Sequence, residues 1–307
     1  MKRYIRADIV DIWEEPYDIR MAAAKNWEAS PRTLMRLAEH EYDYSILGQV
    51  AINPNTPVEA LKLLAKSPFA GVRAYVAKNP NTPSELLVRM YNKEAVTSTA
   101  PLCAIAANQN TPPKILAKLA DHFDEIVRSN VAKNPNIPEN ALDKLSNDVM
   151  FAVQEAATYN PNCKNPEAIL DFLGSQTQYT REQRRTLASN PKTSLALLTR
   201  LADDRDSVTQ GFVAKHTNIP TSLLEKLSKS KYGFVQHCVA KNPNTPTYIL
   251  VNLSKHAEEI NDEWGLADDI IAHPNTPVAI IEKFAQSEDD LIRRGAELRL
   301  QELNRNR

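Results

Sequence analysis

Glycine is scarce in this chain, which has only 7 glycines among 307 residues. Loops that cradle a nucleotide phosphate use several closely spaced glycines, so we expect no such loop here. Cysteine is rarer still: Cys103, Cys163 and Cys238 lie far apart and in no metal-ligand spacing. We therefore expect free thiols, as in a reducing cytoplasm, and neither a metal ion nor another cofactor.

An excess of charge of one sign is also missing, because 37 basic and 38 acidic residues give a net charge of −1. Proteins that bind nucleic acid or a membrane surface through charge are usually more basic, although a neutral total leaves room for a basic face. No apolar run approaches the roughly 18 residues that a membrane-spanning helix needs. Charges interrupt the start of the chain, which is untypical of a signal peptide. The sequence thus predicts a cytoplasmic protein without a membrane segment.

What the chain does contain is a repeated phrase, Asn-Pro-Asn-Thr-Pro, which is intact at 53–57, 79–83 and 242–246. Weaker copies bring the number of repeats to ten, and we call the first residue of each copy its anchor. The anchors are Asn26, Asn53, Asn79, Asn108, Asn134, Asn160, Asn190, His216, Asn242 and His273. Their spacing is 26 to 31 residues, and a fixed period in this range indicates a solenoid. The long intervals recur every third repeat, which suggests duplicated triplets with extra residues in the connections.

Apolar residues flank each anchor at helical spacing. Large apolar residues stand 8 and 11 positions after most anchors, as at Leu61 and Leu64, and others stand 3 and 7 positions before, as at Val76 and Val72. A threonine precedes a proline at several expected helix starts, as at Thr56, which predicts a Thr N-cap and a Pro in the first turn. Each repeat is therefore expected to be two short helices joined by a proline-fixed turn.

These patterns predict an all-α protein organised as a solenoid of about ten two-helix repeats, with a period of about 26 residues, over residues 20–285. Residues 1–19 match the repeat poorly and are predicted to form an N-terminal cap, in which Ile9, Ile12 and Trp13 cover the first repeat. Residues 286–307 are predicted to form a C-terminal capping helix with an apolar stripe that includes Leu291 and Ala296.

The repeat pattern Val-Ala-x-Asn-Pro-x-Thr-Pro-x-x-x-Leu-x-x-Leu-Ala resembles the leucine-rich repeat variant family of bacterial proteins. Its best copies are 76–90, 239–253 and 50–65, and the resemblance covers roughly residues 20–285. It implies a right-handed superhelix in which α-helices alternate with short or 3₁₀ helices. Some members carry a cysteine-rich iron–sulfur segment before the repeats, but residues 1–25 hold no cysteine, so that cofactor is not expected.

No set of side chains in the sequence suggests catalysis. His216 and His273 occupy anchor positions, where they are expected to replace asparagine in a turn. His237 and Cys238 are adjacent, so on a helix they point in different directions and form a poor nucleophile–base pair. We expect no enzymatic activity and no small-molecule substrate.

Positions four and five before the anchor differ from repeat to repeat, although the apolar positions barely change. A fixed solenoid scaffold with varied surface residues is typical of repeat proteins that bind extended partners. The leading hypothesis is an interaction scaffold for another protein. The partner-binding residues that it predicts are Tyr75, Asn130, Phe212, His237 and Arg185. The alternative interpretation is surface variation without function.

Two other columns are basic, six and one positions before the anchor. They contain Arg20, Arg73, Arg128 and Arg184, and Lys25, Lys78, Lys133, Lys215 and Lys241. Stacked in register, they could form a ridge that follows the phosphates of a nucleic acid, which is the alternative function. The competing structural interpretation is that lysine favours a helix C-terminus and that salt bridges between repeats occupy the ridge.

Overall fold

The computed structural model of the chain describes residues 12–94, 98–175, 180–259 and 265–305. Within these residues it contains α-helices, one 3₁₀ helix, η1 (Ile12–Glu14), and no strand. Every anchor lies between two α-helices, which confirms the predicted all-α solenoid of ten repeats. The chain divides into two compact units, residues 1–169 and residues 170–307, which are built from the same repeat.

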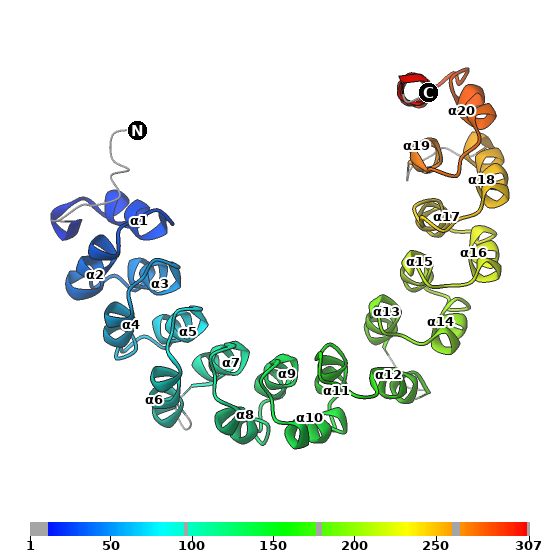
Figure 1. Ribbon diagram of the computed structural model, residues 1–307. Helices are drawn as coiled ribbons and strands as arrows, with labels where there is room; N and C mark the ends of the chain where they lie inside the picture. The colour runs from blue at the N-terminus through cyan, green and yellow to red at the C-terminus, as the bar shows by residue number, and fades with distance from the viewer. Residues whose placement is uncertain (1–11, 95–97, 176–179, 260–264, 306–307) are drawn as a thin grey trace. The chain divides into compact units, whose positions relative to one another are not determined.

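In the first unit, a preceding helix comes before each anchor and a following helix comes after it. The preceding helices are α1 (Tyr17–Lys25), α3 (Tyr44–Ile52), α5 (Ala70–Lys78), α7 (Thr99–Ala107), α9 (Glu125–Lys133) and α11 (Phe151–Thr158). The following helices are α2 (Pro31–His40), α4 (Val58–Leu64), α6 (Ser84–Glu94), α8 (Pro113–Leu119), α10 (Glu139–Ser146) and α12 (Pro166–Ser175), which crosses the division between the units. Within this unit the preceding helices form one row and the following helices a second (Figure 1).

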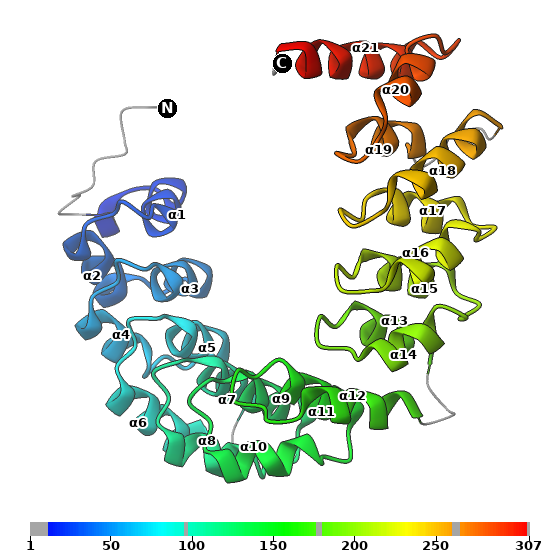
Figure 2. The same cartoon turned by 45° about the vertical axis from the view of Figure 1, so that its right-hand side comes forward.

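In the second unit the same alternation continues. Its preceding helices are α13 (Arg181–Ser189), α15 (Ser207–Lys215), α17 (Gly233–Ala240) and α19 (Leu266–Ala272). Its following helices are α14 (Leu195–Leu201), α16 (Thr221–Ser228), α18 (Thr247–Glu259) and α20 (Val278–Phe284). A last helix, α21 (Asp290–Arg305), packs against α19 and α20 (Figure 2). The short helix of each repeat is thus an α-helix rather than the 3₁₀ helix that the resemblance offered as an alternative.

The core lies between the two rows and repeats with the sequence. Leu61 and Leu64 of α4 and Val72 and Val76 of α5 are at most 2% exposed. The alanine two positions before the anchor is also buried, as at Ala77, and a small side chain there lets neighbouring preceding helices such as α5 and α7 pack closely. One repeat cannot bury this surface alone, so stacking makes a continuous core.

The anchor asparagine joins neighbouring repeats within each unit. The Asn79 amide nitrogen donates to the carbonyls of Ala51 (2.7 Å) and Asn53 (2.9 Å), and its oxygen accepts from the Asn81 backbone amide. Ala51 lies in the last turn of α3, where carbonyls have no partner within the helix. The same bonds recur at Asn53, Asn108, Asn134, Asn160 and Asn242. We call this series the asparagine ladder.

Histidine reproduces the anchor geometry, as the sequence predicted. In His273, Nδ1 accepts from the Asn275 backbone amide (3.0 Å), so Nε2 carries the proton and donates to the Asn242 carbonyl (2.9 Å). His216 contacts the Ala188 carbonyl through Nε2 (2.7 Å). An imidazole ring therefore places an acceptor and a donor where the asparagine amide has them.

The threonine in the phrase does not cap the helix that follows, so that prediction was wrong. Thr82 Oγ1 instead donates to the Val76 carbonyl, six residues earlier, and Thr56, Thr111, Thr193, Thr245 and Thr276 repeat the bond. The hydroxyl thus satisfies the last turn of the helix before it. Ser30 behaves as predicted, because its hydroxyl accepts from the Thr33 amide at the start of α2.

The three longest intervals contain long following helices, although α2, in an interval of 27 residues, also has 10 residues. α6, α12 and α18 have 11, 10 and 13 residues, whereas α8, α10, α14, α16 and α20 have 7 or 8. In the interval after Asn160, two extra residues, Cys163 and Lys164, stand in the turn before α12, and residues 95–97, 176–179 and 260–264 of the long intervals lie outside the described residues. At the ends, Ile12 and Ala296 are buried and Trp13 is half-buried, but Leu291 is 79% exposed and does not join a covered stripe. Ile9 lies outside the described residues.

Candidate interaction surface

Each arginine six positions before the anchor is the fourth residue of its preceding helix. Arg128 on α9 shows the arrangement most completely. Its Nε and one terminal nitrogen donate to both carboxylate oxygens of Asp148 (2.7 and 3.0 Å), which precedes α11. Its other terminal nitrogen donates to the carbonyls of His122 (2.7 Å) and Phe123 (2.8 Å) in the connection before α9. One guanidinium therefore ties the connections of two neighbouring repeats, and we call this contact an arginine clamp.

Other repeats carry versions of the clamp. Arg20 pairs with Glu41, Arg73 with Glu94 and Arg184 with Asp204. Arg20 and Arg73 also bond carbonyls of their own connections. The arginine column is thus engaged in contacts between repeats, and it does not form the free basic ridge that the nucleic-acid hypothesis needs. These arginines instead form salt bridges between repeats, as the competing structural interpretation of the basic columns predicted.

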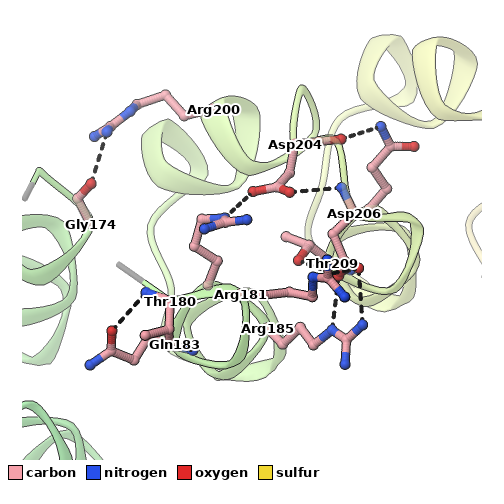
Figure 3. Close-up of polar contacts among 11 residues, drawn as sticks. Gly174, Thr180, Arg181, Gln183, Arg185, Arg200, Asp204, Asp206 and Thr209 are labelled. Atoms are coloured by element: carbon pink, nitrogen blue, oxygen red, sulfur yellow. Dashed lines mark hydrogen bonds and ion pairs between the residues drawn. The ribbon is translucent and has the colours of Figure 1, made fainter. Parts of the chain in front are cut away.

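Burial and hydrogen bonding act in opposite directions on the carboxylates of these pairs. Burial would raise the pKa of Asp148, but donors from Arg128 and the Met150 amide lower it below the ordinary value. The pKa of Asp206 is held far below its usual range, mainly by the hydrogen bonds from Arg185. Figure 3 shows Arg185 reaching Asp206, which also accepts from Thr209 at the start of α15. The acidic run 203–206 therefore serves pairing and helix capping.

The lysine column behaves differently. Lys25, Lys78, Lys133, Lys215 and Lys241 are all exposed at or next to the C-termini of preceding helices. Lys241 lies 3.6 Å from an Asp269 carboxylate oxygen, and Lys215 lies over the rings of Phe212 and Phe234 at 5.6 and 5.9 Å. Only the lysine half of the predicted basic surface is therefore open to solvent.

The predicted partner-binding residues in the first unit are accessible to different degrees. Tyr75 on α5 is 41% exposed, and its ring covers Gly48 of α3, where an added Cβ would stand 3.2 Å from it. Asn130 on α9 is partly exposed and donates to the Ile126 carbonyl within its own helix. Both residues lie on the row of preceding helices, and Tyr75 is the more available for a partner.

The predicted residues of the second unit contact neighbouring repeats. Arg185 is bidentate to Asp206 at 2.9 Å for both bonds, and His237 Nδ1 lies 2.5 Å from Asp269 Oδ2 on α19. Burial raises the pKa of Asp269, whereas the neighbouring His237 and Lys241 act to lower it. Phe212 is partly exposed beside Lys215. Arg185 and His237 thus contact carboxylates of the next repeat, whereas Phe212 lies beside Lys215.

Comparison with solved structures finds the same architecture. The chain is similar to "a leucine-rich repeat variant with a novel repetitive protein structural motif", with a TM-score of 0.50 and 18% sequence identity. The alignment covers 76% of this chain and 88% of that one. This chain has the leucine-rich repeat variant fold. No protein-family model matches the chain, and no curated protein sequence matches it. The likeness therefore supports the fold alone.

The side chains that could bind a metal ion are spread along the residues that the structure describes. In the described parts of the chain, no three His, Cys, Asp or Glu side chains lie close enough together to hold a metal ion. The three cysteines are free thiols, and burial raises the pKa of both Cys103 and Cys238. None of the described helices is long and apolar enough to cross a membrane.

A further feature escaped sequence reasoning. Large apolar side chains stand almost fully in solvent in the connections before preceding helices, at Tyr42 (88% exposed), Phe123 (84%) and Val149 (93%). They lie 11 positions before their anchors, so aligning the repeats on the anchors could have found them. Their exposure depends on the path of the connection, which the helical pattern does not predict.

Proposed function

We propose that this protein is a non-enzymatic interaction scaffold that binds a protein partner over the row of preceding helices. The observation that carries the proposal is a rigid frame with varied side chains. The asparagine ladder and the arginine clamps tie repeats at opposite ends of the preceding helices, while positions four and five before the anchor carry residues of many types. A preorganised surface loses little conformational entropy when a partner docks.

Tyr75 and Phe212 are the residues expected to contribute most. Aromatic side chains dominate binding energy in interfaces because they bury a large area with few rotatable bonds. Tyr75 is fixed against Gly48, and Phe212 stands beside Lys215. Truncating such a residue to alanine typically costs about 1–2 kcal/mol or more of binding free energy, which corresponds to a roughly tenfold higher dissociation constant.

The test is affinity capture from native lysate, followed by a dissociation constant for each captured partner with Tyr75→Ala and Phe212→Ala. Matched controls are Leu63→Ala on α4 and Tyr248→Ala on α18, which remove exposed apolar side chains from following helices. We expect the first pair to weaken binding about tenfold and the controls to leave it unchanged. Unchanged affinity in both Tyr75→Ala and Phe212→Ala would refute the assignment of this surface.

A second candidate is nucleic-acid binding through the exposed lysines. It is favoured by one observation: the last five residues of α1, α3, α5, α7 and α9 include Lys25, Lys78 and Lys133 and no acidic residue. Binding to a single-stranded oligothymidine should then be micromolar, steeply salt-dependent and abolished by Lys78→Glu with Lys133→Glu. Retained binding in that double variant would exclude this candidate. Reversing the arginines would not discriminate, because they hold the fold.

A further inference from the structure

Four exposed apolar side chains occur in connections of the first unit. We call Tyr42, Phe69, Phe123 and Val149 the apolar ridge; their exposed fractions are 88%, 43%, 84% and 93%. Each stands 10 or 11 positions before its anchor, just ahead of α3, α5, α9 or α11. Exposed large apolar residues that recur at one repeat position are unlike the scattered ones of an ordinary surface.

Neighbouring members of this series are held close together. The clamp residue Arg128 bonds both the Phe123 carbonyl and Asp148, which immediately precedes Val149. One side chain therefore fixes the connections that carry Phe123 and Val149. At the other end of the series, the Tyr44 ring lies 5.7 Å from the Phe69 ring in the next repeat. The ring contact and the clamp thus each link two neighbouring repeats, and the equivalent position before α7 falls in 95–97, outside the described residues.

The connection that carries Tyr42 is also fixed from inside. Glu41 accepts from Nε of Arg20 (2.8 Å), and its other carboxylate oxygen accepts from the Tyr42 and Asp43 backbone amides (both 2.9 Å). The backbone is therefore rigid while the Tyr42 ring remains in water. An apolar side chain on a fixed backbone can be buried by a partner with little loss of entropy, as in the central residues of interfaces.

The charges around the ridge indicate the sign of the charge that its partner carries. The connections 41–45, 121–126 and 148–150, which carry Tyr42, Phe123 and Val149, contain six carboxylates and no lysine or arginine, whereas the connection 65–69 with Phe69 contains Lys66 and no carboxylate. The clamps pair Glu41 and Asp148, and Lys144 pairs with Asp121. Asp43, Asp124 and Glu125 are left without an ion pair among the described residues. A cationic partner is therefore attracted to this edge and an anionic one is repelled.

We propose that the apolar ridge docks a basic segment of another protein, in which lysine or arginine residues flank large apolar side chains. The apolar residues of that segment cover Tyr42, Phe123 and Val149, and its basic residues face Asp43, Asp124 and Glu125. This surface is separate from the varied positions on the preceding helices, so the protein has two docking surfaces that can be tested independently.

The test selects a random peptide library displayed on phage against three forms of the full-length protein. The ridge variant is Tyr42→Ser, Phe123→Ser and Val149→Ser, which changes only side chains that are at least 84% exposed. The control variant is Trp27→Ser, Phe172→Ser and Leu291→Ser, which removes three large exposed apolar groups elsewhere (57–79% exposed). Wild type and control should select peptides with net positive charge and at least two large apolar residues. The ridge variant should bind those peptides at least tenfold more weakly.

Several results would overturn the proposal. The selection could yield no peptide whose binding depends on the ridge, or the peptides whose binding depends on it could be neutral or acidic. Ridge-dependent self-association in light scattering would show that a second copy is the occupant, and ridge-dependent binding to phosphatidylcholine vesicles would show a lipid surface. Peptides that need the ridge but bind Tyr75→Ala and Phe212→Ala normally would support it. A failure here leaves the proposed surface on the preceding helices unaffected.

Discussion

The anchor asparagine offers the sharpest test of how the repeats are joined. Asn79 is fully buried and makes three hydrogen bonds, two of them to carbonyls of the preceding repeat. Asn79→Ala removes all three, at about 1 kcal/mol each, and leaves the buried Ala51 carbonyl without its side-chain donor, which costs about 1 kcal/mol or more. We expect a loss of about 3–5 kcal/mol in the free energy of unfolding.

Other substitutions at this position should fall in a defined order. Asn79→His should lose only about 1–2 kcal/mol, because His273 shows that imidazole keeps the acceptor and one donor. Asn79→Asp should be at least as damaging as alanine, since it directs a carboxylate oxygen at two carbonyls less than 3 Å away. The matched control is Asn81→Ala, which removes one exposed bond to the Pro54 carbonyl and should cost at most about 1 kcal/mol.

The assay is urea unfolding followed by circular dichroism at neutral pH, with the transition slope compared between variants because repeat proteins can unfold in parts. The expected order of stability is wild type, histidine, alanine, aspartate. An aspartate variant as stable as the histidine variant, or an Asn81→Ala variant as unstable as Asn79→Ala, would refute the role assigned to the ladder.

Two further predictions concern the Arg128 clamp and the Arg185–Asp206 pair. Arg128→Met should lower the free energy of unfolding by about 2–4 kcal/mol, because it leaves the nearly buried Asp148 without its cation. Arg128→Lys should lower it by less, since an ammonium group cannot reach all four acceptors of the guanidinium. Urea unfolding measures both variants, and the exposed Lys133→Met is a control that is expected to be neutral. The folded-state pKa of Asp206 is depressed, so its stabilisation is complete above the unfolded value of about 4 and is lost as the pH falls toward the folded value. The stability difference between wild type and Asp206→Asn should therefore shrink below about pH 4, and a difference independent of pH down to 2 would contradict this account.

The sequence predicted most of the fold because each repeat encodes its own local structure. Apolar spacing at Leu61, Leu64 and Val76 indicated two helices, and the turn around the anchor was expected from its prolines. The role of Thr82 was missed, because a threonine before proline is a common N-cap and only the path of the turn shows its hydroxyl facing backward. The anchor amide was correctly placed in the turn, but its bonds 26–28 residues away depend on stacking.

The candidate site was harder to predict because charge in a sequence does not show its partner. Arg128 and Asp148 are 20 residues apart, and they meet only because stacking brings position six before one anchor to position twelve before the next. A column of arginines therefore looks like a binding ridge until the neighbouring repeat is placed. Arg128, which the alternative hypothesis placed in a nucleic-acid ridge, instead fixes the connections that carry the exposed Phe123 and Val149. In a solenoid, the pairs formed between repeats decide which surface residues remain free for a partner.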